Sequence, residues 1–67
     1  METVDTRGFS CPTPVLMVKD ALDKGAKELE VLVDNGAARD NITRHAESRG
    51  KKVDCKTTGG DYVLTIR

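Results

Sequence analysis

The spacing of apolar residues along the chain changes between a period of two and a period near 3.6, which predicts four strands and two helices. Gly25 and Gly50 follow the two helical patterns as stop signals. The pair Gly59-Gly60 predicts a hairpin between the last two strands. In chain order, the elements are expected at residues 2–6 (strand), 12–24 (helix), 28–34 (strand), 37–49 (helix), 51–57 (strand) and 62–67 (strand).

The order β-α-β-α-β-β predicts a two-layer α/β (α+β) sandwich. Two helices are too few to cover both faces of a four-stranded sheet, so both are expected on one face. Right-handed crossovers make the first three strands parallel, and the closing hairpin makes the fourth antiparallel to the third, giving a mixed sheet. The open face then carries Leu32 and Val63, and Leu16 lies on the polar side of the first helix. These are either ordinary exposed apolar residues or part of a partner surface.

Length and charge restrict the classes of protein that fit. The 67 residues are expected to form one domain, residues 1–67. Lys+Arg and Asp+Glu are both 11, and Phe9 and Tyr62 are the only aromatic residues, so direct nucleic-acid binding is not expected. No apolar run approaches the length of about 18 residues that a membrane helix needs. With no signal peptide pattern, we expect a cytoplasmic protein with reduced cysteines and no membrane partner.

The segment from Gly8 to Pro14 carries the candidate chemistry. Cys11 lies directly before Pro12, and proline is favoured at the first position of a helix. Cys11 is therefore expected at the N-cap or next to it, where the helix dipole and the N–H groups of Thr13 and Val15 would stabilise a thiolate. The alternative is a small apolar residue that precedes a proline-started helix.

The remaining candidates offer less. Cys55 is in phase with Val53 on a strand and is expected to be a small core residue. His45 is expected about two turns from the end of the sheet that carries Cys11, as a structural residue. The two cysteines and His45 are too scattered for a metal site, and neither a metal nor another cofactor is expected. Arg39, at the start of the second helix, is either solvated or placed to hold an anionic sulfur species or a partner carboxylate.

Taken together, these residues resemble the TusA/SirA/YedF family of small sulfur-carrier proteins, through a CPxP motif in its full setting. Thr13 stands where TusA often has Glu, and residues 33–41 are most similar to the YedF-like branch. The matching features, in chain order, are Asp5, Gly8, Cys11-Pro12-x-Pro14, a strand ending in Asp34, Arg39-Asp40, Gly50 and the Gly-rich turn.

The resemblance implies both a fold and a function. The fold would be that of the C-terminal domain of translation initiation factor three. Cys11 would accept sulfane sulfur as a persulfide from a donor such as a cysteine desulfurase and pass it to an acceptor protein. Acceptor pathways in the family include tRNA thiolation, sulfur oxidation, molybdenum-cofactor supply and selenium metabolism. Supporting roles are implied for Asp5, Gly8, Pro12, Thr13, Pro14 and Arg39.

Two other functions compete with a sulfurtransferase or sulfur carrier. One is a non-catalytic interaction or regulatory module, in which residues 11–14 only cap a helix. The other is an RNA-binding module, which rests on fold analogy alone and is opposed by the zero net charge and scarce aromatics. The chain is either a complete small carrier or one domain of a longer protein.

Overall fold

The computed structural model describes residues 2–10 and 12–67, so Cys11 lies outside the described residues. All six expected elements are confirmed, with bounds that differ from the predicted ones by no more than two residues. The elements are β1 (Glu2–Asp5), α1 (Thr13–Asp23), β2 (Leu29–Val33), α2 (Gly36–Ser48), β3 (Val53–Thr58) and β4 (Asp61–Ile66).

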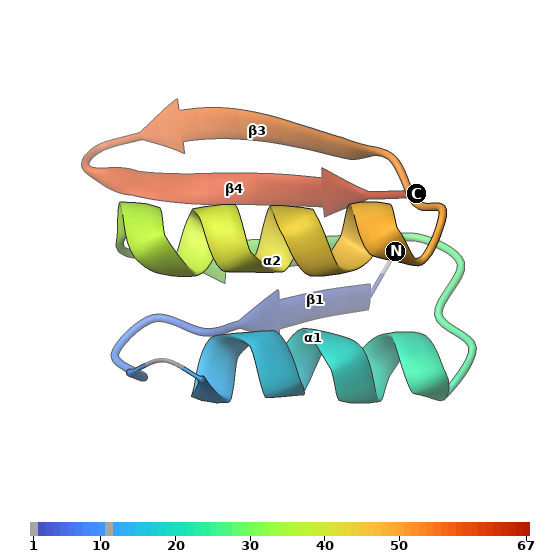
Figure 1. Ribbon diagram of the computed structural model, residues 1–67. Coiled ribbons are helices and arrows are strands. Elements are labelled where there is room, and N and C mark those ends of the chain that lie inside the picture. The colour runs from blue at the N-terminus through green and yellow to red at the C-terminus, as the bar shows by residue number, and fades with distance from the viewer. Residues whose placement is uncertain (1, 11) are drawn as a thin grey trace.

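The four strands form one mixed sheet in the order β1-β2-β4-β3. β1 pairs in parallel with β2, while β4 runs antiparallel to both of its neighbours. β1, β2 and β3 therefore point the same way, as predicted, and β4 runs between β2 and β3 (Figure 1). This confirms the two-layer α+β sandwich.

Both helices pack on the same face of the sheet. On β2 the residues Leu29, Val31 and Val33 are fully buried, whereas the alternate residues Glu30 and Leu32 are only half-buried. This alternation shows that one face of the sheet is covered by helices and the other is open. The predicted apolar stripes of the helices are buried against the covered face: Val18, Ala21 and Leu22 from α1, and Ala38, Ile42 and Ala46 from α2.

Cys55 is not the core residue that its phase predicts. It pairs with Leu64 of β4, so it points to the helix-covered side of the sheet, yet Leu64 is fully buried and Cys55 is exposed. The reason is position: β3 is the edge strand, and the helix layer does not cover it as far as Cys55. Val53, on the same strand, is half-buried.

The start of α2 is fixed by a local cap. Asn35 adopts extended backbone, and its side-chain Oδ1 accepts a hydrogen bond of 2.8 Å from the Ala38 N–H. This satisfies one of the amide donors that a helix N-terminus leaves unpaired. Asn35 is therefore the N-cap residue at which α2 begins.

Substitution of Ile42 by Ala tests the core assignment. Ile42 is fully buried, so its truncation is expected to lower the free energy of unfolding by about 2–5 kcal/mol. Leu16→Ala is the control, because Leu16 is 54% exposed and its loss should change stability by no more than about 0.5 kcal/mol. Urea denaturation followed by circular dichroism measures both values. Equal losses in the two variants would contradict the packing of α2 on the sheet.

Candidate functional site

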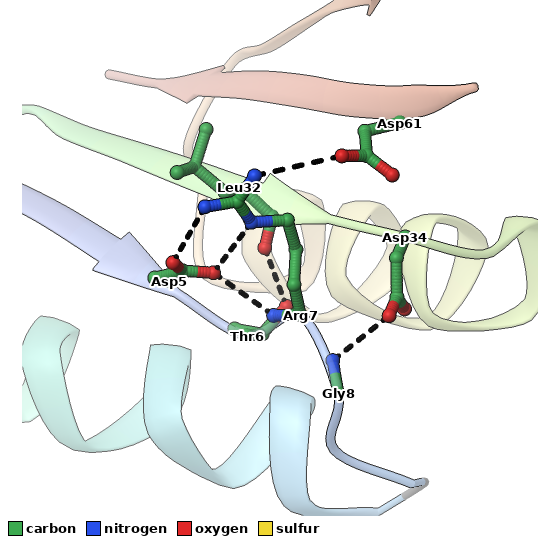
Figure 2. A network of polar contacts seen from close by, with 7 residues as sticks. All are labelled: Asp5, Thr6, Arg7, Gly8, Leu32, Asp34 and Asp61. Atoms are coloured by element: carbon green, nitrogen blue, oxygen red, sulfur yellow. Dashed lines mark hydrogen bonds and ion pairs between the residues drawn. The ribbon is translucent and has the colours of Figure 1, made fainter. Parts of the chain in front are cut away.

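The loop that leads to Cys11 leaves β1 at a buried threonine. The Thr6 N–H and the Thr6 hydroxyl both donate to the main-chain oxygen of Leu32, at 2.9 and 2.7 Å. Thr6 is only 1% exposed, and both of its donors are satisfied by one acceptor on β2 (Figure 2). The chain therefore follows β2 for one residue beyond the end of β1.

Gly8 is tied to the residue that follows β2. Its N–H donates to the Asp34 carboxylate at 2.8 Å, and the Asn35 side chain donates to the same carboxylate at 2.9 Å. The hydrogen bond from Gly8, followed by that from Asn35, lowers the pKa of Asp34 below its ordinary value. Gly8 adopts φ +85°, a left-handed conformation that side chains other than glycine disfavour.

Arg7 clamps the same loop to the open face of the sheet. Its main-chain N–H and Nε each donate to Oδ1 of Asp5 at 3.0 Å, and a terminal guanidinium nitrogen donates to Oδ2 at 2.9 Å. The other terminal nitrogen lies 3.6 Å from the Asp61 carboxylate of β4. In Figure 2 the guanidinium passes beside Leu32 between these two carboxylates. The side-chain hydrogen bonds from Arg7, and then its backbone N–H, lower the pKa of Asp5 to about 2.

The start of α1 differs from the sequence expectation. Pro12 is the N-cap residue, Thr13 is the first helical residue and Pro14 is buried at the second position. Cys11 thus directly precedes the cap in sequence, while its own placement lies outside the described residues. The Thr13 N–H donates to the Ser10 carbonyl at 2.9 Å.

Arg39 lies over the aromatic ring of Tyr62, a residue of β4. Its guanidinium is 4.6 Å from the centre of the Tyr62 ring, and its Nε donates to Asp40 at 3.0 Å. The hydrogen bond to Asp40 raises the pKa of Arg39, with smaller electrostatic contributions from Tyr62 and Cys55. Arg39 therefore interacts with β4 and the β3 edge, and no described contact links it to the loop at residues 6–10.

A groove of about 460 Å³ separates the start of α1 from α2. It is open to solvent and is lined by Pro12, Val15, Asn41, Arg44, His45 and Ser48. His45 lies late in α2, as expected, and it lines this groove together with Pro12. The Nε2 atom of His45 is buried and has no hydrogen-bond partner among residues 2–10 and 12–67.

The structure thus sorts the predicted site residues into two groups. Asp5 and Gly8 are brought together in the loop network, and Pro12, Thr13 and Pro14 form the start of α1. Arg39 belongs to neither group, because its described partners are Asp40 and Tyr62. Arg7 was not singled out from the sequence, although a charged pair two residues apart at a strand end is a detectable signal for it.

Residues 2–10 and 12–67 contain neither a metal-binding cluster nor a membrane-spanning helix. No three side chains of the His, Cys, Asp or Glu type lie close enough to hold a metal ion. Neither of the two described helices is long and apolar enough to cross a membrane.

Comparison with protein families matches residues 2–67 to the model of sulfurtransferase TusA. The chain belongs to the TusA family. A candidate sulfur carrier protein of Methanocaldococcus jannaschii is 44% identical over 55 residues, which cover 79% of this chain and 73% of that protein. A crystal structure of a SirA-like protein from Desulfitobacterium hafniense superposes with a TM-score of 0.90 at 34% identity, over 98% of this chain and 95% of the other.

Membership of the TusA family confirms the resemblance read from the sequence and supports a role as a sulfur carrier. Such a role implies contact with sulfur donors and acceptors in general. For this TusA-family chain, the described network shows how the residues before the CPxP motif are held: one hydrogen-bonded anchor at Thr6, a second at Gly8 and an ion pair at Arg7.

Acidification is expected to release the Gly8 anchor. Because the pKa of Asp34 is lowered in the folded protein, the stabilising effect of its carboxylate is present above the ordinary aspartate pKa and is lost as the pH falls through the lowered value. The Gly8 amide signal in ¹⁵N NMR spectra should follow the titration of Asp34. Asp34→Asn should abolish that pH dependence, and Asp20→Asn, which removes an exposed carboxylate on α1, should leave it unchanged. A Gly8 amide that ignores the Asp34 titration would show that the anchor does not form.

Removal of the Arg7 guanidinium should make its partner Asp5 a weaker acid. In Arg7→Gln, the pKa of Asp5 is expected to rise from about 2 toward the ordinary value of 3.8, because its largest stabilising hydrogen bonds are lost. Carboxyl ¹³C NMR titration measures the change. An Asp5 pKa that stays near 2 in Arg7→Gln would mean that another donor lowers it.

Proposed function

We propose that this protein accepts sulfane sulfur as a persulfide on Cys11 and relays it to an acceptor protein. The observation that carries the proposal is the match of residues 2–67 to the TusA family, with Cys11 as the cysteine of the CPxP motif. Acceptors of this kind serve tRNA thiolation or sulfur and selenium metabolism. We further propose that residues 1–67 act as a single domain and that the protein works in the cytoplasm, where thiols stay reduced.

The proposed reaction is a thiolate–persulfide exchange. The Cys11 thiolate attacks the outer sulfur of a donor persulfide, R–S–SH, and a new S–S bond forms on Cys11. The S–S bond of the donor breaks, and the donor leaves as the thiolate R–S⁻. The proton stays on the outer sulfur, so the products are Cys11–S–SH and R–S⁻, and no external oxidant or cofactor is required.

The segments around Cys11 suit this exchange. Exchange between two protein sulfurs needs an accessible sulfur, and the neighbours Ser10 and Pro12 are both exposed. The anchors at Thr6 and Gly8 hold the chain before the cysteine, and α1 begins directly after Pro12. The positive end of the helix dipole at that point favours an anionic sulfur nearby.

Cys55 is exposed as well, but its setting differs. It lies in the middle of the edge strand β3, and its neighbours in the chain are strand residues and not the end of a helix. Its sequence neighbours Asp54 and Lys56 do not form a CPxP motif. Cys55 is therefore the natural internal control for any thiol reactivity of Cys11.

Two exposed apolar side chains also favour a partner surface at this site. Phe9 is 48% exposed and Leu16 is 54% exposed, and they flank Cys11 in sequence. Such a surface fits a carrier that meets a donor. It equally fits a non-catalytic interaction module, which would bind partners without using the thiol.

Persulfide loading distinguishes the two functions. After incubation with a cysteine desulfurase and cysteine, wild type and Cys55→Ala are expected to gain the mass of one sulfur atom, whereas Cys11→Ala is not. Intact-protein mass spectrometry measures the gain, and a thiol reductant should reverse it.

The reverse pattern is equally informative. A folded wild type that gains no sulfur from several desulfurases or from thiosulfate would favour the interaction module. A gain that disappears in Cys55→Ala and persists in Cys11→Ala would assign the carrier role to the other thiol.

A further inference from the structure

Arg44 is unusual among the arginines of this chain. Four of the five arginines form an ion pair with an aspartate: Arg7 with Asp5, Arg39 with Asp40, Arg49 with Asp23 and Arg67 with Asp54. Arg44 pairs with no carboxylate within the described residues, and it is exposed on the wall of the α1–α2 groove. A guanidinium left without a carboxylate beside a groove is available to an anionic ligand.

His45, the next residue in the chain, also has a polar atom that lacks a partner. The Nε2 atom of His45 is buried but has no hydrogen-bond partner in the described part of the chain. Buried polar atoms in native proteins are normally paired, so an unpaired one calls for an explanation. His45 is half-buried and lines the groove, so a small rotation of its ring would let Nε2 meet an acceptor oxygen of the occupant.

The rest of the groove defines the shape and charge of what fits. Its described lining contains Arg44 and His45 but no Asp or Glu, so the charge favours an anion. Pro12 and Val15 form an apolar wall opposite them, which suits an apolar side chain. Pro12 directly follows Cys11 in the chain, so an occupant of the groove contacts the residue next to the proposed carrier cysteine.

We propose that the α1–α2 groove seats an acidic segment of the sulfur-donor protein. In this arrangement an Asp or Glu side chain of the donor accepts hydrogen bonds from Arg44 and His45, and a neighbouring apolar side chain packs on Val15 and Pro12. The identity of the partner as the donor rests on the proposed function, because the donor is the protein that must dock before Cys11 carries sulfur. The open form of the groove suits a segment of a protein surface.

Binding can be measured separately from sulfur transfer. In the Cys11→Ser background, no persulfide forms, and isothermal titration with a cysteine desulfurase reports docking alone. Arg44→Gln is expected to raise Kd by about tenfold, because it removes a charge-assisted contact. His45→Phe keeps the ring and removes the nitrogen, and should raise Kd by about fivefold.

Arg67→Gln is the matched control. It removes the same charge from the far end of β4, where Arg67 pairs with Asp54, and should change Kd less than about twofold. In ¹⁵N NMR spectra, the amide signals perturbed by the desulfurase should centre on Val15, Arg44 and Ser48. Each variant is first checked for native amide dispersion.

Three results would overturn the proposal. They are the absence of binding, equal weakening by Arg44→Gln and Arg67→Gln, and perturbations centred on Leu32 and Val63 of the open sheet face. Competition by single-stranded RNA for the same residues would replace the occupant with a nucleic acid and also overturn it. The proposed function fails separately: a groove-dependent complex in which wild-type Cys11 never gains sulfur would leave the docking site and remove the persulfide relay.

Discussion

The main-chain oxygen of Leu32 is the acceptor on which the geometry before the cysteine depends. It takes both the N–H and the hydroxyl of Thr6, inside the protein and away from solvent. These two hydrogen bonds set the direction in which the chain leaves β1, because Thr6 cannot move without leaving two buried donors unpaired. Only from that starting point can Gly8 reach Asp34 and Arg7 reach both Asp5 and Asp61. The residues that precede Cys11 are thus held by contacts with β2, β4 and Asp34.

The placement of both helices on one face creates the other half of the site. α1 and α2 follow parallel strands, so both begin at the same end of the molecule (Figure 1). Packed side by side, they leave the groove that starts at Pro12 and continues along α2 to Ser48. The two parts of the site therefore differ in their origin. The loop contacts involve the strand ends, whereas the groove is lined mainly by helix side chains outside the fully buried core.

Sequence periodicity was sufficient for the elements, the order of parallel strands and the buried stripes, because these depend on local spacing. It failed at Cys55, since phase reveals the face of a strand but not how far a neighbouring layer extends over the edge. It also did not reveal that His45 and Pro12 line one groove, because the offset between two packed helices is set by their side chains at the contact and not by residue counts. The Gly8–Asp34 bond joins residues 26 positions apart, and no local pattern announces such a contact. The placement of Cys11 stays a prediction.

The interior position of β4 has a consequence for how the chain folds as it is synthesised. β3 touches the sheet only through β4, and β4 joins β2 by pairing Ile66 with Leu29, whose partner arrives 37 residues later (66 minus 29). When both helices and the strands β1, β2 and β3 have been synthesised, the chain still lacks β4, the strand that joins β3 to β2. The sheet can close only after residue 66 has emerged from the ribosome, so this domain is expected to fold in a single late step.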